Sequence, residues 1–416
     1  MKLYFGIVKL AIASAIACVI PRSRDIWVVG GNKGLRFADN SMYFYLYCLK
    51  NTDKKMIWLT RSNSIVEEVR SKGGDAYINT SLMGLYYGFR AKWHVFDVSK
   101  GDTKIFSSKG ANLFNLWHGY PLKDIRRLKA GNPDGVNLKG WKHLVKTKLL
   151  GQRERSDCNY VLWQNEQYVQ HALDSFDVKP ENIITANLPR NVVFEDGFDE
   201  CYYLSDAAAR ASEKLVSHKK NKQKIVGYFP TWRGNGYDLF MGVADRESIE
   251  RLNEFCESQN IVVVTKWHTC LYKDYQHPCE SSSAEDITSI LTRMSNIEVF
   301  GFELDLNSIL PKCDLMISDY SGAIFDYLLI NKPLIFMAYD LENYTKEWGI
   351  LFDYESFVPG DIVKNLDDLQ QCLVHYVADP ENFSSRYEKQ RLEAKAEIFE
   401  RADGNSAIVE QMQKIV

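Results

Sequence analysis

Short apolar runs that alternate with helical segments, in two successive series, constrain the fold of this chain more than any other feature. The first series of predicted strands occupies residues 26–31, 55–60, 76–78, 93–97, 112–117, 160–164 and 183–186. Segments between these runs, such as 65–72 and 81–90, have the apolar spacing of helices. Strands that alternate with helices are typical of a parallel sheet covered by helices. The first series therefore predicts an α/β domain.

The alternation restarts after a charged helical segment at 205–222. The second series of predicted strands occupies residues 224–229, 261–266, 297–300, 315–318 and 333–337. Further helices are predicted at 249–258, 323–330, 366–377 and 383–402. Two such series predict two similar parallel-sheet domains that face a cleft. We place the domains at 21–210 and 211–416, after an apolar segment at 1–20.

The composition is that of an ordinary globular chain. Of 416 residues, 45% are hydrophobic and 25% are charged, which excludes a collagen-like or wholly disordered chain. A formal net charge of -3 argues against a general nucleic-acid-binding protein, because such proteins need a large positive field. The 9 cysteines form no C-x-x-C motif, so we expect the reduced thiols of a cytosolic protein and no metal site.

Residues 3–20 form the longest apolar stretch of the sequence. Lys9 interrupts the stretch and Arg22 and Arg24 follow it, so it is a poor candidate for a membrane-spanning helix. Basic residues beside an apolar helix favour an interfacial helix on anionic lipid, and hence peripheral attachment to a membrane. A helix buried against the N-terminal domain explains the pattern equally well.

Four polar motifs directly follow predicted strands. They are WHGYPLK at 117–123, PTWR at 230–233, KWH at 266–268 and SDYSG at 318–322. Ligands of open parallel sheets bind beyond the carboxyl ends of the strands. The four motifs are therefore the candidate ligand-binding segments.

Each of the first three motifs suits phosphate chemistry, although each also has a purely structural interpretation. His118, on a turn before a glycine, can act as a general base, or it is a loop histidine satisfied by the backbone. Thr231 and Arg233 suit phosphate recognition, or they belong to a loop with a surface ion pair. Lys266 and His268 project to the same side of an extended segment and can neutralise a phosphate, or they form a solvent-exposed strand end.

The fourth motif places Ser321 and Gly322 at a predicted helix N-terminus, where backbone N–H groups can bind phosphate. Simple N-capping by Asp319 or Ser321 explains the same residues. Neither glycine-rich nucleotide fingerprint occurs at a suitable place, and no nucleophile elbow is present. Together the four motifs supply what a nucleotide diphosphate and an acceptor hydroxyl require.

Several segments resemble the CDP-glycerol glycerophosphotransferase family, the TagB/TagF-type enzymes of teichoic acid and capsule polymers. The resemblance is carried by WHGYPLK, PTWR, SDYSGAIFDYLLINKPLIFMAYDLENY, FERADGNSA and a segment that ends in Pro-Arg-Asn at 189–191. It extends over about residues 20–412. The resemblance implies a GT-B-like fold of two Rossmann-like domains, an N-terminal acceptor side and a C-terminal CDP-donor side. It also implies transfer of a polyol phosphate from a CDP-polyol to an acceptor hydroxyl, with release of CMP.

Roles for individual residues follow from the resemblance. It implies a catalytic pair in which His118 is the base for the incoming hydroxyl and His268 acts at the pyrophosphate. The donor-binding set, which the resemblance assigns to pyrophosphate, cytidine and ribose, comprises Thr231, Arg233, Lys266, Asp319, Ser321, Gly322 and Asp326. The sequence departs from the family pattern at Tyr120, Thr269 and Gly322, where Thr, Pro and Ser are usual. These departures leave the identity of the polyol open.

The implied partners are CDP-glycerol or a related CDP-polyol and an acceptor that is a lipid-linked saccharide or a polyol-phosphate polymer. We expect the chain at the cytoplasmic face of a bacterial membrane, in contact with the membrane surface, without nucleic acid, cofactor or obligatory metal. Glycerol is the first candidate polyol and ribitol the second. A nucleotide-sugar glycosyltransferase of the same fold and a non-enzymatic scaffold are the competing hypotheses. The chain has little beyond the two domains, which favours a primase-like or capsule role, and polymerisation remains open.

Overall fold

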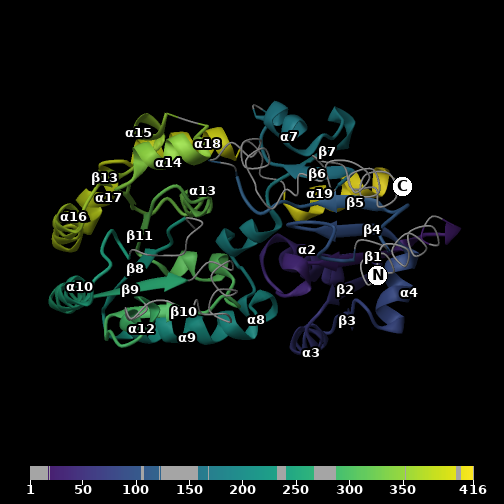
Figure 1. Cartoon of the computed structure of the whole chain (residues 1–416), viewed down its shortest axis with the longest axis horizontal. Helices are drawn as coiled ribbons and strands as arrows, with labels where there is room; N and C mark the ends of the chain where they lie inside the picture. Colours follow the sequence, from purple (N-terminus) through teal and green to yellow (C-terminus); the bar gives the residue numbers. More distant parts are fainter. Residues whose placement is uncertain are drawn as a thin grey trace, which may run out of the picture. The chain divides into compact units, whose positions relative to one another are not determined.

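The computed structural model describes residues 17, 19–104, 107–120, 122, 158–166, 168–231, 240–266, 287–351, 353–399 and 404–415. The chain divides into two compact units (Figure 1). Unit 1 comprises Met1–Gly119, Ile125–Ser205 and Phe399–Val416, and unit 2 comprises Tyr120–Asp124 and Asp206–Ile398. Each unit is built on its own parallel sheet.

Unit 1 has a seven-stranded sheet in the order β3-β2-β1-β4-β5-β6-β7. The strands are β1 (Ser23–Gly30), β2 (Lys55–Thr60), β3 (Asp75–Ile78), β4 (Ala91–Phe96), β5 (Asn112–Asn115), β6 (Tyr160–Trp163) and β7 (Ile183–Thr185). All neighbours pair in parallel; Val28 on β1, for example, lies between Ile57 and His94. The helices are α2 (Asp39–Asn51), α3 (Asn63–Ser71), α4 (Leu82–Arg90), α7 (Val169–Phe176), α8 (Glu200–Tyr203) and α19 (Asn405–Lys414).

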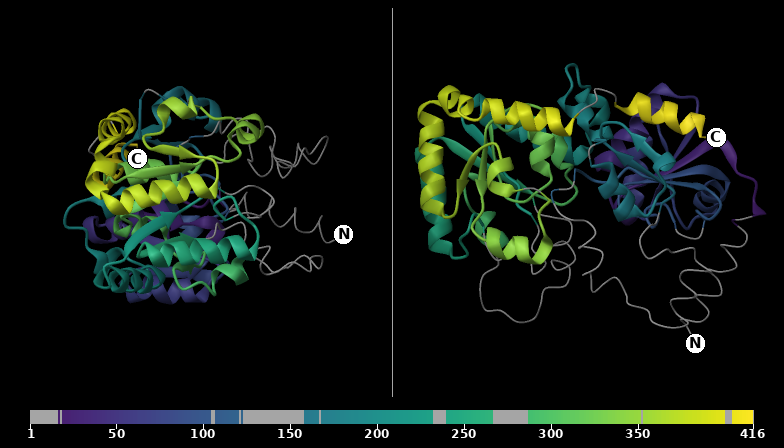
Figure 2. Two further views of the ribbon diagram at one scale, coloured as in Figure 1. Left: turned by 90° about the vertical axis from the view of Figure 1, so that its left-hand side faces the viewer. Right: turned by 90° about the horizontal axis from the view of Figure 1, so that it is seen from above.

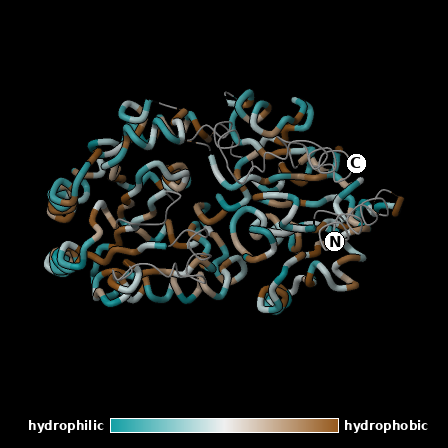
Figure 3. The backbone as a smooth tube through the Cα atoms, viewed as in Figure 1, coloured by the Kyte–Doolittle hydropathy of each residue, from teal (hydrophilic) through white to brown (hydrophobic). Residues whose placement is uncertain are grey.

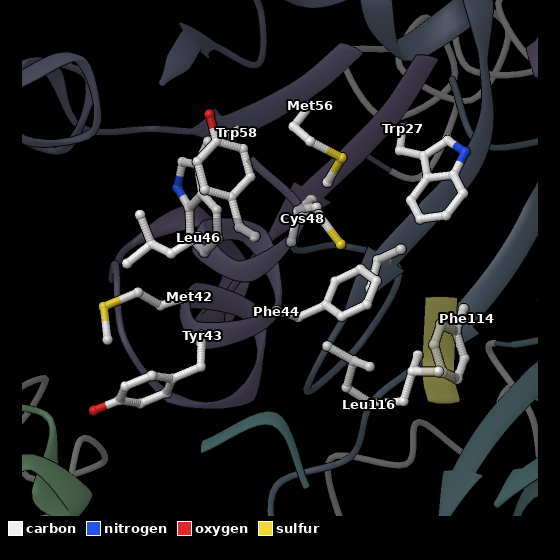
Figure 4. Close-up of a cluster of buried hydrophobic side chains, with 14 of the residues drawn as sticks. Trp27, Met42, Tyr43, Phe44, Leu46, Cys48, Met56, Trp58, Phe114 and Leu116 are labelled. Carbon is white, nitrogen blue, oxygen red and sulfur yellow. The ribbon is translucent and has the colours of Figure 1, made fainter. Parts of the chain in front are cut away.

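Helix α2 fills the core of unit 1. Figure 4 shows its Met42, Phe44 and Leu46 among the aromatic side chains of the central strands. Trp27 of β1 stacks on Phe44 with ring centroids 6.4 Å apart, and Trp58 of β2 is fully buried. Large rings interlocked in this way bury much apolar area and hold α2 rigidly across the sheet. The first residues of α2 are therefore held firmly beside the carboxyl ends of the strands.

Unit 2 has a six-stranded sheet in the order β10-β9-β8-β11-β12-β13. The strands are β8 (Lys224–Tyr228), β9 (Ile261–Lys266), β10 (Ile297–Phe300), β11 (Leu315–Ser318), β12 (Leu334–Met337) and β13 (Asp361–Val363). The helices are α9 (Asp206–Lys220), α10 (Arg246–Ser258), α12 (Ile287–Leu291), α13 (Ala323–Leu328), α14 (Leu341–Trp348), α15 (Tyr354–Phe357), α16 (Leu366–Ala378), α17 (Pro380–Ser385) and α18 (Glu388–Ile398). In Figure 3 the tube of α16 carries both hydrophilic and hydrophobic residues, as expected for a helix with one buried face.

The last helix, α19, belongs to unit 1. In Figure 2 it lies, in yellow beside the C label, among the purple and blue elements of that unit. Gln411 of α19 bonds both polar groups of the Thr185 backbone on β7: its Oε1 accepts from the amide N at 3.3 Å, and its Nε2 donates to the carbonyl O at 3.1 Å. The sequence predicted a second domain that runs from residue 211 to the last residue. In the structure, the chain passes from unit 1 to unit 2 between Ser205 and Asp206, and it returns to unit 1 at Phe399.

The prediction of an α/β chain with two parallel sheets is confirmed. The predicted apolar helix at 1–20 lies outside the described residues except for residues 17, 19 and 20. Among the helices of the described residues, none is long and apolar enough to cross a membrane. The single helix predicted at 383–402 is instead divided into α17 and α18.

Candidate functional site

His118 lies in a tight turn directly after β5. Trp117 and Gly119, its neighbours, have φ angles of 57° and 145°, both in the left-handed region. A Cβ on residue 119 would lie 3.1 Å from Nη2 of Arg190, so this position is restricted to glycine by both conformation and space. The turn leaves the His118 side chain exposed.

The orientation of the His118 ring determines which of its nitrogens can act as a base. Nδ1 lies 3.2 Å from the main-chain carbonyl oxygen of Asp97, at the end of β4. A carbonyl oxygen only accepts, so Nδ1 carries the proton in this contact. In the neutral ring Nε2 then holds the lone pair that can take a proton from a substrate. The Trp117 ring lies against the imidazole, with centroids 4.0 Å apart.

Side chains from three elements bond the backbone of the turn. Oδ1 of Asn115 accepts from the Trp117 amide N at 2.8 Å, and Nδ2 of Asn40 donates to the Trp117 carbonyl at 2.8 Å. Nη1 of Arg190 donates to the His118 carbonyl at 2.9 Å. Asn115 ends β5, Asn40 lies in the first turn of α2, and Arg190 belongs to the short helix Pro189–Phe194.

Arg190 also forms an ion pair with Asp39, the first residue of α2. Nη1 of Arg190 lies 2.7 Å from Oδ1 of Asp39, and only 6% of the Arg190 side chain is exposed. Burial by itself would raise the pKa of Asp39, but the charge and hydrogen bond of Arg190, helped by the nearby His118, lower it. Asp39 is therefore ionised next to the histidine turn at neutral pH.

A second acidic pair, Asp97 and Asp102, is fully buried next to the same turn. The carboxyls accept from backbone amides: Asp97 from Asn32 at 3.3 Å, and Asp102 from Lys33 at 2.7 Å. Burial and mutual repulsion raise the pKa of Asp97 well above its usual range, and burial raises that of Asp102. Two carboxyls buried beside each other do not both ionise readily, so the pair holds a proton more strongly than an ordinary aspartate does.

The same two carboxyls accept hydrogen bonds from the glycine-rich loop after β1. Asn32, Lys33 and Gly34 have successive φ angles of 44°, 58° and 77°, a conformation whose amides form an anion-binding nest. In many sheets of this kind such a loop binds phosphate. Here Asp97 and Asp102 take the amides of Asn32 and Lys33, so this loop of unit 1 is satisfied by the protein itself.

Three predicted donor-binding residues lie at the carboxyl ends of neighbouring strands of unit 2. Thr231 follows β8, Lys266 ends β9, and Asp319 follows β11. These strands are consecutive in the sheet, so the three residues share one edge. Thr231 and Asp319 are buried and Lys266 is half-buried.

Asp319 joins the loops after β8 and β11. Its Oδ1 accepts from the amides of Thr231 at 2.8 Å and Tyr320 at 2.6 Å. Its main-chain oxygen accepts from the hydroxyl of Tyr354 at 2.9 Å. These bonds show that Asp319 organises the backbone of this edge.

Ser321 and Gly322 precede α13, as predicted. Oγ of Ser321 accepts from the Ala323 amide at 3.3 Å, a local bond within the turn, and Gly322 at the N-cap has no side-chain capping bond. Helix α13 has only six residues and Asp326 is buried within it, so its dipole is small. A Cβ at position 322 would lie 3.3 Å from the Tyr120 carbonyl oxygen, a tight fit for a larger residue.

The remaining predicted site residues, Arg233 and His268, lie outside the described residues. Within the described part of the chain, no group of three or more His, Cys, Asp or Glu side chains is arranged to hold a metal ion.

Sequence reasoning missed Asp39, Asn40, Arg190 and the acidic pair. The signal for Arg190 was present, because the Pro-Arg-Asn segment follows a strand just as the other motifs do. Asp39 had no such signal: it stands 151 residues from Arg190, within a segment that shows only a helical pattern.

Comparisons with known proteins give one consistent family. A sequence model of the family described as CDP-glycerol:poly(glycerophosphate) glycerophosphotransferase matches residues 17–412. A Staphylococcus aureus teichoic acid glycerol-phosphate transferase is 23% identical over 82% of this chain and 81% of its own length. A Bacillus spizizenii teichoic acid poly(glycerol phosphate) polymerase is 23% identical over 97% of this chain and 95% of its own length.

Other relatives are longer. The chain is 29% identical to the S. aureus teichoic acid ribitol-phosphate polymerase TarK over 63% of its own residues, but it spans only 45% of that protein. Among solved structures, the wall teichoic acid polymerase TagF superposes with a TM-score of 0.66 at 20% identity, over 95% of this chain and 88% of that one. At this identity the likeness supports the fold, and it agrees with the expected GT-B-like architecture.

Proposed function

Because the chain belongs to the CDP-glycerol:poly(glycerophosphate) glycerophosphotransferase family, we propose that it transfers a polyol phosphate from a CDP-polyol to an acceptor hydroxyl and releases CMP. Glycerol phosphate is the first candidate, and the setting is the synthesis of teichoic acid or a capsule-type polymer. The observation that supports the proposal is the His118 turn, in which the contact of Nδ1 with the Asp97 carbonyl places the lone pair of the neutral imidazole on Nε2.

In the proposed reaction the acceptor oxygen attacks the phosphorus that carries the polyol. A new P–O bond forms to the acceptor, and the bond from that phosphorus to the CMP oxygen breaks. The acceptor proton passes to Nε2 of His118, and the bond electrons leave on CMP. Phosphoryl transfer of this kind depends mainly on positioning and charge stabilisation.

We assign the donor to the carboxyl edge of the unit 2 sheet. Lys266 at the end of β9 neutralises the pyrophosphate together with Arg233 and His268. The Thr231 loop, held by Asp319, contacts donor phosphate or cytidine. Ser321 and Gly322 contribute a hydroxyl and backbone groups, and Asp326 orients α13 from within, where it is buried.

The direct test is a panel of nucleotide donors supplied with polyol-phosphate or lipid-linked saccharide acceptors. We expect CMP release from CDP-glycerol, with a product heavier by one or more glycerol phosphate units. Preference for CDP-ribitol would change the polyol and keep the chemistry. Turnover of UDP- or GDP-sugars without CDP-polyol turnover would replace the proposal by a glycosyltransferase. Absence of CDP binding in calorimetry would leave only a scaffold.

We also propose peripheral contact with the cytoplasmic face of the membrane, where a lipid-linked acceptor would be found. Helix α4 supports this, because its Leu82, Met83 and Tyr86 are 87%, 43% and 51% exposed. Nη1 of Arg90, on the last turn of α4, donates to the Pro21 carbonyl, so the apolar face adjoins the end of the predicted interfacial segment. An apolar patch beside basic residues is typical of an interfacial surface.

Replacing Leu82 and Tyr86 together by serine is expected to weaken binding to vesicles of phosphatidylglycerol and phosphatidylethanolamine about tenfold or more, because two large side chains no longer enter the interface. Co-sedimentation measures the effect. The matched control is Leu392→Ser on α18, which removes a side chain 48% exposed in unit 2 and is expected to leave binding unchanged. Equal binding by the double variant and the wild type would rule out α4 as the contact surface.

A further inference from the structure

The strained turn of His118 is stabilised by an ion pair that the reaction itself does not require. We propose that Arg190 and Asp39 form a positioning pair, which holds the His118 backbone and sets how readily the imidazole takes up a proton. The inference rests on the proposed function, since it concerns the same base. Neither residue is assigned a place among the groups that contact substrate.

The first argument is mechanical. Left-handed backbone at a non-glycine residue such as Trp117 is strained and persists only where the surroundings enforce it. Arg190 supplies this constraint: Nη1 bonds the His118 carbonyl at 2.9 Å and the Asp39 carboxylate at 2.7 Å. The guanidinium thereby ties the turn to the start of α2.

Asn40 locks the same arrangement from the side of α2. Its Oδ1 accepts from the Arg190 amide N at 3.2 Å, while its Nδ2 donates to the Trp117 carbonyl at 2.8 Å. Asn40 and Arg190 are both buried, so water competes little for these bonds. The turn, the short helix at Pro189–Phe194 and α2 therefore behave as one rigid constellation.

The second argument is electrostatic. Asp39 and His118 are close enough that each feels the charge of the other. The Asp39 carboxylate stabilises the imidazolium that forms when His118 takes the acceptor proton, and the Arg190 guanidinium opposes this. The pair thus places two opposite charges around one imidazole. Removing either member therefore changes how readily His118 takes up a proton, and the direction of the change follows from the sign of the charge removed.

The other titratable groups around His118 lie on two further elements. Asp97 and Asp102, after β4, are buried carboxyls with raised pKa values. Helix α7 contacts Trp117 through Phe176, with ring centroids 4.8 Å apart, and carries His171 and Asp174. Because these groups are identical in all variants below, they cancel in the comparison.

The experiment measures kcat against pH for the full chain with Asp39→Asn, Arg190→Gln and Arg190→Lys. We expect each variant to lose at least about tenfold in kcat at the optimum, as misplacement of a general base does. The acidic limb of the kcat–pH profile is the range in which activity falls because His118 takes up a proton. Removing the Asp39 charge makes His118 harder to protonate, so this limb moves to lower pH. Removing the Arg190 charge has the opposite effect, and the acidic limb moves to higher pH. Each shift is expected to be about half a pH unit or more.

Arg190→Lys separates geometry from charge, because lysine keeps the charge but cannot make two fixed bonds. We expect it to lose kcat with little movement of the acidic limb. The matched control is Arg22→Lys: Arg22 also holds backbone carbonyls, including those of Gly88 and Ala91, but it lies at the amino end of β1. Its acidic limb should coincide with that of the wild type.

Limbs that coincide in all variants, or that move in the same direction in Asp39→Asn and Arg190→Gln, would overturn the inference and leave a structural ion pair. A failure of the proposed function is recognised separately, by a wild type that releases no CMP from any CDP donor. In that case an NMR titration of the His118 imidazole in the same variants still tests the opposite shifts, and it does not depend on turnover. If Arg190→Gln does not fold, Asp39→Asn still tests the shift of the acidic limb to lower pH, and Arg190→Lys still tests the loss of kcat that follows from geometry alone.

Discussion

Replacing His118 by alanine is expected to lower kcat for CMP release from the CDP-polyol by about 10²–10⁴-fold, the usual contribution of a positioned general base. The side chain is exposed and its Nδ1 makes one long bond to the Asp97 carbonyl, so its loss should cost little stability. The KM for the donor should change little, because the donor is assigned to unit 2. Steady-state CMP release and a thermal melt are the two measurements.

The control for this experiment is His375→Ala. His375 is exposed on α16 of unit 2, remote in sequence from every proposed site residue, and its removal should leave kcat unchanged. Full turnover by His118→Ala would contradict the assignment of the base. A loss of activity that accompanies a large fall in melting temperature would instead indicate that the turn supports the fold.

The second large effect is expected for stability and arises from the buried carboxyls. Between the usual aspartate pKa, 3.8, and the raised pKa of the pair, the folded protein keeps a proton that the unfolded chain releases. The unfolded state then binds fewer protons, so the free energy of unfolding falls by about 1.4 kcal/mol for each pH unit of increase. Because the folded pKa is raised, this stability is present at low pH and lost as the pH rises.

Asp97→Asn removes this loss of stability with rising pH, because an amide imitates the protonated acid and does not titrate. Relative to the wild type, the variant should gain about 1.4 kcal/mol per pH unit within the window. Urea unfolding at a series of pH values from roughly 5 to 8 measures the difference. Asp53→Asn, which changes a carboxyl whose side chain is 87% exposed, should keep the wild-type slope. Parallel curves for Asp97→Asn and the wild type would show that Asp97 does not keep a proton in the folded protein.

The parts of the fold that the sequence predicted are those encoded by local patterns. The runs of β-branched and aromatic residues at β1, β2 and β9 predicted buried parallel strands, and these strands form as expected. His118, Thr231 and Asp319 were identified because a polar motif directly after an apolar strand is visible in the sequence. Strand ends in an open sheet gather at one edge, so a local pattern is enough to predict which edge of each sheet carries the candidate residues.

The parts that were missed depend on contacts between distant segments. The bond between Arg190 and Asp39 joins residues 151 positions apart, and only the complete sheet of unit 1 brings them together. The division at α17 and α18, and the return of α19 to unit 1, depend on packing that a helical pattern does not report. Asp97 and Asp102 carry no signal in the sequence, because burial of a polar residue is a property of the tertiary structure.

The position of α19 connects this helix, through Arg190, to the turn of the proposed base. Nδ2 of Asn405 donates to the carbonyl of Pro189, the residue immediately before the arginine that restrains His118. Gln411 of α19 hydrogen-bonds the backbone of β7. A truncation before Asn405 would leave both sheets intact but would remove the helix that supports the Arg190 segment. Damage to α19 would therefore act on the turn of His118, the proposed base, from a position far along the sequence.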